Sequence, residues 1–143
     1  MNGQQSIEAA HRENYFLELR ARDKFLAKTQ TYSLSELQRV LGKRDRNGRK
    51  QIRRWIRCRR IVSIVHHGQL YIPKFQFRNN RRLLPIVRHL LRILGPVYSR
   101  WSIAHWFVSP NGWLDGDRPI DLLEHEPELA LLVYAAEQAV LET

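Results

Sequence analysis

Residues 48–61 read GRKQIRRWIRCRRI, and they constrain the chain more than any other segment because they carry seven cations and no acidic residue. At about 100° per residue, a helix through them gathers six cations on one face and places Ile52, Trp55 and Ile56 on the other. Arg59 alone falls on the apolar side, where it either snorkels to solvent or lies past the last turn. We therefore predict an amphipathic helix with one buried face and one stripe of cations.

The cationic stripe has a feature that an ordinary solvated helix face lacks. Arg49, Arg53 and Arg57 repeat every four residues with no acidic residue between them. Like charges at this spacing destabilise a helix by a few tenths of a kcal/mol per pair, so solvated faces generally mix positive and negative side chains. The one-sided arrangement favours binding of a polyanion over a merely solvated face.

Charge is distributed unevenly along the 143 residues. Residues 31–82 contain fifteen Lys and Arg against two Asp and Glu, whereas residues 83–143 contain four against eight. Residues 1–30 are nearly balanced, with five against four. A basic module thus precedes an acidic one, and we expect the two to face different partners.

Cysteine content and hydropathy exclude several classes of protein. The single Cys58 excludes an intrachain disulfide framework and a cysteine-based zinc site, which fits a reducing cytosol. No apolar run approaches the length of a transmembrane helix, and the first residues lack the pattern of a signal peptide. We expect a cytoplasmic globular protein with no membrane partner.

A short helix and a turn precede the basic helix. Ser33 and Glu36 have the spacing of a capping box, and Gly42 suits the residue after a helix. The turn reads KRDRN, and the basic helix is expected to start near Gly48. This order predicts a helix-turn-helix, whose second helix normally enters the major groove of DNA.

Two strand-like runs follow in RIVSIVHHGQLYIPKFQF, hinged at His67-Gly68, and Pro73 ends the second strand. A hairpin in this place is a wing, which commonly contacts phosphate or the minor groove. Its apolar positions allow the alternative that the hairpin only completes a small core. The predicted DNA-contacting residues are the cations of the turn and basic helix together with three residues of the hairpin tip: Arg44, Arg46, Arg49, Lys50, Arg53, Arg54, Arg57, Arg60, His66, His67 and Gln69.

The predicted organisation is mainly α, with an N-terminal winged helix-turn-helix containing one β-hairpin and a C-terminal all-helical domain. Residues 1–30 contain an amphipathic helix over 6–28 that either packs on the core or pairs with a second copy, so a homo-oligomer is left open. The winged helix-turn-helix spans 31–78, a linker spans 79–83 and the helical domain spans 84–143. We expect its first helix to have Pro85 in the first turn and its last helix to open at Pro127.

The loop SPNGWLDGDRP joins two helices of the second half. Its Asn-Gly and Asp-Gly dipeptides favour turns on both sides of Trp113. An indole in such a loop suits an interface anchor. For Pro110, Gly116 and Pro119, a role in joining the helices is as good an interpretation as a role in binding.

Two stretches resemble known families. Residues 34–77, with LSELQRVLG, QIRRWIRCRRIVSIV and HGQLYIPKFQF, resemble the winged helix-turn-helix of MerR and excisionase-type regulators. Residues 84–140 resemble the toxin-binding domain of Xre, MbcA and ParS antitoxins. In that family a tryptophan-containing helix leads to Trp-hydrophobic-x-x-Pro-Asn, then Leu-x-Gly-x-x-Pro, then Asp-Leu-Leu. This chain carries in those places Trp106, Phe107, Pro110, Asn111, Leu114, Gly116, Pro119, Asp121, Leu122 and Leu123.

The second resemblance implies a protein partner. The usual toxins of that family are RES-domain enzymes that act on NAD, so a RES-like toxin is the implied partner. Asp115 departs from the pattern, because relatives often carry Gly there, and Thr143 follows directly on the last helix. The residues implied to bind the toxin lie in the aromatic helix and the loop: Trp106, Asn111, Trp113, Leu114, Asp115, Gly116, Arg118 and Pro119.

Enzymatic interpretations have little support in the sequence. Asp115, Asp117 and Asp121 have the D-x-D-x₃-D spacing of a weak Mg²⁺ motif, but turns and a helix start explain all three. The chain has no HExxH motif and no Gly-rich phosphate loop. We predict no catalysis, no cofactor and no metal.

The expected function is that of an antitoxin-like transcription regulator in a toxin-antitoxin system. It would bind double-stranded operator DNA through the basic module and neutralise a cognate toxin through the helical domain. The alternatives are an excisionase- or phage-type DNA-binding regulator without a toxin partner and a metal-dependent nuclease.

Overall fold

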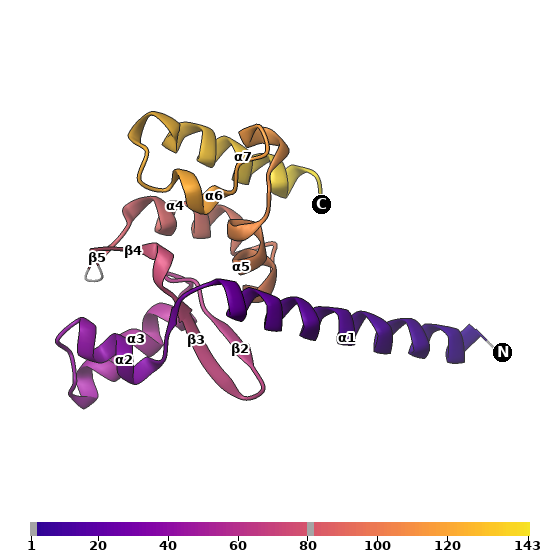
Figure 1. Ribbon diagram of the computed structural model, residues 1–143, viewed down its shortest axis with the longest axis horizontal. Coiled ribbons are helices and arrows are strands. Elements are labelled where there is room, and N and C mark those ends of the chain that lie inside the picture. The colour runs from indigo at the N-terminus through magenta and orange to yellow at the C-terminus, as the bar shows by residue number, and fades with distance from the viewer. Residues whose placement is uncertain (1–2, 80–81) are drawn as a thin grey trace. The chain divides into compact units, whose positions relative to one another are not determined.

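A computed structural model describes residues 3–79 and 82–143 of the chain. The described chain is mainly helical with small antiparallel sheets (Figure 1). It divides into two compact units, the first ending at Gln30 and the second spanning Thr31–Thr143. The elements in chain order are α1 (Gly3–Lys28), β1 (Thr31–Tyr32), α2 (Leu34–Val40), α3 (Arg46–Arg57), β2 (Ile64–His66), β3 (Gln69–Pro73), η1 (Lys74–Gln76), β4 (Phe77–Arg78), β5 (Arg82–Leu83), α4 (Pro85–Leu94), α5 (Arg100–Val108), η2 (Gly112–Leu114), α6 (Pro119–Leu122), η3 (Glu126–Glu128) and α7 (Leu129–Leu141).

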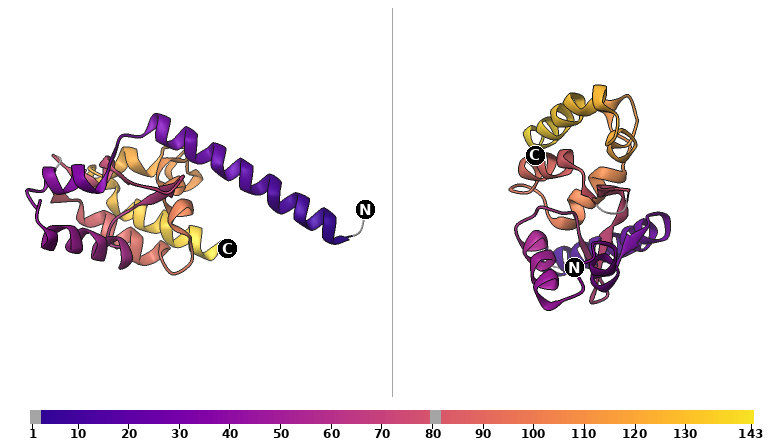
Figure 2. Two further views of the ribbon diagram at one scale, coloured as in Figure 1. Left: turned by 90° about the horizontal axis from the view of Figure 1, so that it is seen from below. Right: turned by 90° about the vertical axis from the view of Figure 1, so that its left-hand side faces the viewer.

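The first unit contains one continuous helix, α1 (Figure 2). The predicted helix over 6–28 is confirmed, and it begins earlier, at Gly3. Glu18 and Arg22 form an i,i+4 ion pair of 3.2 Å along it. Tyr15 and Phe16 are exposed on its surface, with ring centroids 6.0 Å apart. The two roles proposed for this helix, packing or pairing, both stay predictions.

The caps of α2 and α3 explain where these helices begin. The predicted capping box is confirmed, because the Glu36 amide donates to Ser33 Oγ at 3.1 Å and the Ser33 amide donates to Glu36 Oε1 at 3.3 Å. Asp45 caps α3, since its Oδ1 accepts from the Gly48 amide at 2.7 Å. The helix therefore starts at Arg46, two residues before the predicted start.

A three-stranded antiparallel sheet in the order β1-β3-β2 lies beside these helices. The predicted hairpin is confirmed, with Ile64 paired to Tyr71 and His66 paired to Gln69. The turn residues His67 and Gly68 both have positive φ, 49° and 75°, as a two-residue type I′ turn requires. The prediction did not include β1, because a strand of two residues leaves no pattern in the sequence.

The hydrophobic core of this region joins both helices to the sheet. Leu37 of α2, Ile52 of α3 and Ile72 of β3 are fully buried. Trp55 is only partly buried against the core, with its ring 5.5 Å from Lys43 Nζ. The apolar face predicted for α3 is thus confirmed, but its aromatic residue lies at the rim of the core.

The amide of Gln76 connects three segments of the second unit. Its side chain is fully buried, Oε1 accepts from the Val62 amide at 2.7 Å, and Nε2 donates to the Val62 carbonyl at 2.9 Å. Nε2 also donates to the Pro73 carbonyl at 3.0 Å. The backbone carbonyl of Gln76 accepts from Leu84, immediately before α4. One residue therefore satisfies backbone groups after α3, at the end of β3 and before α4.

The segment predicted as a linker, residues 79–83, contains more structure than expected. Phe77 pairs with Leu83 and Arg78 pairs with Arg82, so β4 and β5 form a second small antiparallel pair. The fold therefore has strands beyond the one predicted hairpin. The central part of the predicted linker, residues 80–81, lies outside the described residues.

The second half forms a packed helical group in which α4 contacts α7 most extensively (Figure 1). The predicted helices are present, with Pro85 in the first turn of α4 and Ser99 capping α5. The last helix begins two residues later than predicted, at Leu129, because Pro127 lies in the short 3-10 turn η3 before it. The ring of Phe107 on α5 is fully buried and lies 5.3 Å from the ring of Phe75, which follows β3. This contact joins the helical group to the basic region. Both predicted domains fall within the single compact unit Thr31–Thr143, and their division at 79–83 stays a prediction.

Among the described residues, no helix combines the length and the apolar character that crossing a bilayer requires.

We expect Gln76→Leu to destabilise the fold by about 3 kcal/mol or more, because it leaves the buried amide and carbonyl of Val62 without partners at about 1–3 kcal/mol each. Denaturant unfolding of both proteins measures the difference. Gln69→Leu is the matched control, since Gln69 is exposed, and it should change stability by less than about 0.5 kcal/mol. Equal stability of the two variants would show that the hydrogen bonds of the buried Gln76 amide do not stabilise the fold.

Candidate nucleic-acid interface

The exposed face of α3, the turn before it and the residues just after it carry the predicted cations. Ile52 and Ile56 are buried on the opposite face. Within residues 3–79 and 82–143, these cations form no ion pair with an acidic side chain, so their charge is uncompensated locally. All eight are exposed: Arg44, Arg46, Arg49, Lys50, Arg53, Arg54, Arg57 and Arg60.

The first turn of α3 is held tightly against the preceding turn. The buried Gln38 amide donates to the carbonyl oxygens of Lys43 and Asp45, both at 3.1 Å. A Cβ atom on Gly48 would lie 2.3 Å from the Lys43 carbonyl oxygen, which no real side chain tolerates. The absence of a side chain at Gly48 therefore lets α3 begin directly against the turn.

The other end of α3 is fixed by Arg59. The Arg59 amide donates to Ile56 at 3.1 Å and the Arg60 amide donates to Trp55 at 2.8 Å, as in a Schellman motif. Arg59 has φ of 54°, a left-handed conformation that costs a residue with a side chain about 1 kcal/mol or more. Its guanidinium donates to the carbonyl oxygens of Gly95 and Tyr98. Of the two predicted positions for Arg59, the structure has the one past the last turn.

The hairpin tip differs from the prediction at one residue. His67 and Gln69 are exposed, as expected of residues that reach a ligand. His66 is buried, at 3% exposure, and its ring centroid lies 4.0 Å from that of His67. The alternation of a strand explains this, because Ile64 and His66 lie on the same, buried face of β2. The prediction that His66 is displayed at the tip is therefore wrong.

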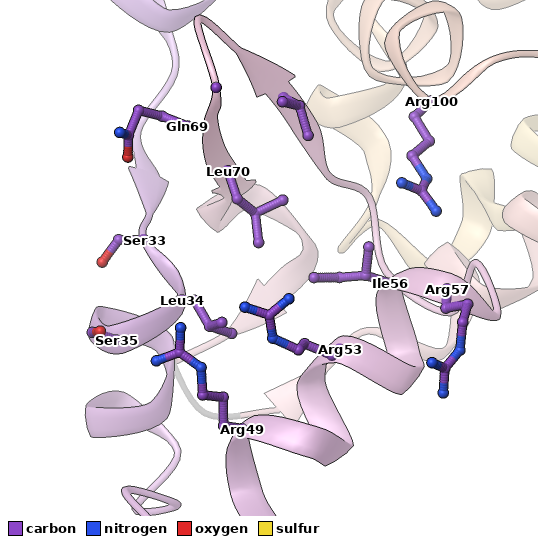
Figure 3. Close-up of a pocket in the computed structure, with 12 residues that line it drawn as sticks. Ser33, Leu34, Ser35, Arg49, Arg53, Ile56, Arg57, Gln69, Leu70 and Arg100 are labelled. Atoms are coloured by element: carbon purple, nitrogen blue, oxygen red, sulfur yellow. The ribbon is translucent and has the colours of Figure 1, made fainter. Parts of the chain in front are cut away.

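An open groove of about 660 Å³ lies between α3, the hairpin and the start of α5 (Figure 3). In Figure 3, Arg49 and Arg53 extend from α3 toward the side where Leu34 and Leu70 lie, and Arg100 extends down from α5. No acidic residue lines it. The lining residues are Ser33, Leu34, Ser35, Arg49, Arg53, Ile56, Arg57, Val65, Gly68, Gln69, Leu70 and Arg100.

The groove brings together only some of the predicted residues. Arg49, Arg53 and Arg57 meet Gln69 there, since residues four apart share one helix face. The remaining predicted cations and His67 are exposed outside the groove. Arg100 was missed, because it lies far along the chain from α3 and no local pattern marks it.

A second groove, of about 560 Å³, lies between the loop after α5 and the end of α7. Trp113 is 44% exposed beside it, packs edge-on against Tyr134 at 5.5 Å, and donates from Nε1 to Glu142 Oε1 at 3.2 Å. Trp106 also lines the groove, and its Nε1 is buried and donates to no group among the described residues. The groove therefore combines two indoles with one unused hydrogen-bond donor.

The residues implied to bind a toxin have different environments. Asp115 and Gly116 are exposed at a turn in which both have positive φ, 55° and 87°, which confirms the predicted turn. Leu114 and Pro119 are buried, so they hold the loop in place and offer no surface.

Arg118, also implied to bind a toxin, is exposed but already paired. It contacts Asp121 through two hydrogen bonds of 3.1 Å and 3.0 Å. The side-chain hydrogen bonds from Arg118 lower the pKa of Asp121 below its usual value. Both carboxylate oxygens of Asp121 are therefore occupied within the loop.

Comparisons with known proteins give one structural relative. No protein-family model matches the chain, and no curated protein matches it significantly. Its structure is similar to the NMR structure of Rv2175c, with a TM-score of 0.63 and 23% sequence identity over 78% of this chain and 82% of that chain. A likeness at this identity shows a shared fold. The resemblance to Xre, MbcA and ParS antitoxins stays a prediction.

We expect Gly48→Ala to weaken both the fold and any ligand binding by α3, because the added methyl group forces α3 away from the Lys43 carbonyl. Overpacking of this kind costs about 1–3 kcal/mol. The control is Gly112→Ala, since a Cβ there meets nothing within 4 Å. Thermal unfolding compares them, and an unchanged melting temperature for Gly48→Ala would contradict the packing described above.

Proposed function

We propose that this chain is a DNA-binding transcription regulator in which α2, α3 and the β2-β3 hairpin act as a winged helix-turn-helix. The observation that carries the proposal is the groove lined by four arginines and no acidic residue. Arginine guanidinium groups bind phosphate oxygens and the edge of guanine through paired hydrogen bonds. An α-helix fits the major groove of B-DNA, and the hairpin beside it suits the adjacent backbone.

The arrangement of α3 supports DNA over a small anionic ligand. Its twelve residues extend over about 18 Å, which covers several phosphates of a duplex. The exposed cations also continue beyond the groove in both directions, from Arg44 to Arg60. Such a long, one-sided surface suits a rod of regularly spaced charges. We place this activity in the cytoplasm as part of the same proposal.

We expect Arg53→Ala to weaken binding of a fluorescein-labelled, mixed-sequence DNA duplex, measured by anisotropy at several salt concentrations. If Arg53 binds phosphate, the slope of log K against log salt should fall by about 1, evenly across sequences. If it reads a base, the loss should be about 1–3 kcal/mol and confined to particular sequences. Arg92→Ala, which removes an exposed charge outside the groove, is the matched control.

The same assay discriminates between nucleic acids. The wide major groove of B-DNA admits a helix, whereas the deep, narrow major groove of duplex RNA does not. We therefore expect a DNA duplex to bind more tightly than an RNA duplex of the same sequence. Binding that does not depend on salt, or a preference for RNA, would overturn the proposal.

We propose in addition that the second groove binds a protein, which would make the regulator antitoxin-like. The specific observation is the half-exposed Trp113 beside the buried, unused donor of Trp106. Tryptophan is enriched among the residues that dominate protein interfaces, and native structures leave few buried donors without an acceptor. The resemblance to Xre, MbcA and ParS antitoxins suggests a toxin, with a RES-like enzyme as the candidate.

We expect Trp113→Ala to weaken the complex with the protein encoded by the neighbouring gene by about 2 kcal/mol or more. DNA affinity of the isolated protein should stay unchanged, because the two grooves share no residue. Leu131→Ala, which truncates an exposed apolar residue of α7 outside the groove, serves as the control. Loss of both protein binding and DNA binding, together with a lowered melting temperature, would instead show that Trp113 stabilises the fold.

The alternatives make different predictions. An excisionase- or phage-type regulator would bind DNA in the same way but would form no complex through Trp113. A metal-dependent nuclease would need free carboxylate oxygens, whereas both oxygens of Asp121 accept hydrogen bonds from Arg118. We propose no catalytic role for this loop, and DNA that stays intact with Mg²⁺ present is the expected result.

A further inference from the structure

Arg100 is the first residue of α5 and belongs to the acidic second half of the chain, yet its side chain lines the groove beside α3. Figure 3 shows it extending toward Ile56 and Arg57 of α3. Arg100 is exposed, and it forms no ion pair with any described residue. It therefore faces the same space as three arginines of the basic helix, with its charge uncompensated.

The position of Arg100 relative to α3 is fixed by Arg59. The Arg59 guanidinium donates to the carbonyl oxygens of Gly95 and Tyr98, the latter at 2.8 Å. These carbonyls lie in the connection between α4 and α5, and Tyr98 precedes Arg100 by two residues. The Tyr98 hydroxyl donates to the Ala139 carbonyl of α7 at 2.7 Å, so this connection is held from both sides.

The residue at position 95 makes the approach of Arg59 possible. A Cβ atom there would lie 3.3 Å from Cδ of Arg59 and 2.6 Å from the Leu91 carbonyl oxygen. Because Gly95 lacks this atom, the guanidinium reaches the two carbonyls directly. The left-handed backbone at Arg59 aims the side chain across to the second half, away from the cationic stripe.

We propose that the DNA-binding surface crosses from α3 onto the second half of the chain, where Arg100 binds a backbone phosphate next to those reached by Arg53 and Arg57. Arg59 is a positioning residue that holds Arg100 in register with α3 and itself contacts no DNA. This inference rests on the proposed DNA binding and extends it to a residue outside the helix-turn-helix.

The first test measures the salt dependence of binding to the fluorescein-labelled, mixed-sequence duplex with the full chain. One phosphate contact contributes about 0.9 to the slope of log K against log salt for B-DNA, so Arg100→Ala should flatten the slope by about this amount. Arg100→Lys should keep the slope near that of the unmodified protein, because it keeps the charge. Arg92→Ala removes a charge from the same half outside the groove and should leave the slope unchanged.

Three outcomes of this test have different meanings. An unchanged slope for Arg100→Ala beside a flattened slope for Arg53→Ala would overturn this inference and keep the proposed DNA binding. Unchanged slopes for both would overturn both proposals. If Arg100→Ala and Arg92→Ala flatten the slope equally, Arg100 acts only through the net charge of the protein. That outcome would overturn a specific contact between Arg100 and a phosphate.

The second test separates positioning from contact. Arg59→Gly keeps the left-handed backbone and removes the guanidinium, so circular dichroism should show a folded protein. If Arg59 acts through Arg100, Arg59→Gly alone should flatten the slope of log K against log salt. Adding Arg59→Gly to Arg100→Ala should then cause no further flattening. Additive effects of the two substitutions would show that Arg59 binds DNA independently, which would overturn its positioning role.

Discussion

The buried amide of Gln76 is the contact on which the arrangement of the second unit depends. Its side chain satisfies both backbone groups of Val62, and its backbone carbonyl accepts from Leu84. An unsatisfied buried backbone group costs about 1–3 kcal/mol, so these segments do not separate easily. Val62 follows the basic helix, and Leu84 directly precedes α4, the first helix of the second half. The cationic helix is therefore placed relative to the second half by hydrogen bonds as well as by apolar packing.

The basic helix forms although its own charges oppose it. Each pair of like charges four residues apart costs a few tenths of a kcal/mol, and the several pairs along α3 together cost about 1 kcal/mol. Burial of Ile52 and Ile56 contributes about 3 kcal/mol or more, and the Asp45 cap contributes about 1 kcal/mol. Packing thus outweighs repulsion. The helix can keep an unneutralised face, which is the property that a polyanion would use.

The two halves differ in net charge but share one surface. Arg100 lies in the acidic half, yet it joins the arginines of α3 at the same groove. The Phe75–Phe107 contact, the hydrogen bond from the Leu84 amide to the Gln76 carbonyl and the Arg59 hydrogen bonds all cross between the halves. The second groove, beside Trp113, lies on residues that share none of the first groove's lining. The two ligands that we propose would therefore use separate surfaces of a single compact unit.

Local sequence patterns determined the helices, their caps, the hairpin turn and the division of charge, because each depends on residues within a few positions of one another. The capping box at Ser33, the turn at His67-Gly68 and the buried face of α3 are of this kind. Only the tertiary structure decided that Gln76 connects Val62 to Leu84 and that Arg100 lies beside α3. These outcomes arise from contacts between residues far apart in the chain, and neither periodicity nor spacing encodes which distant side chains will meet.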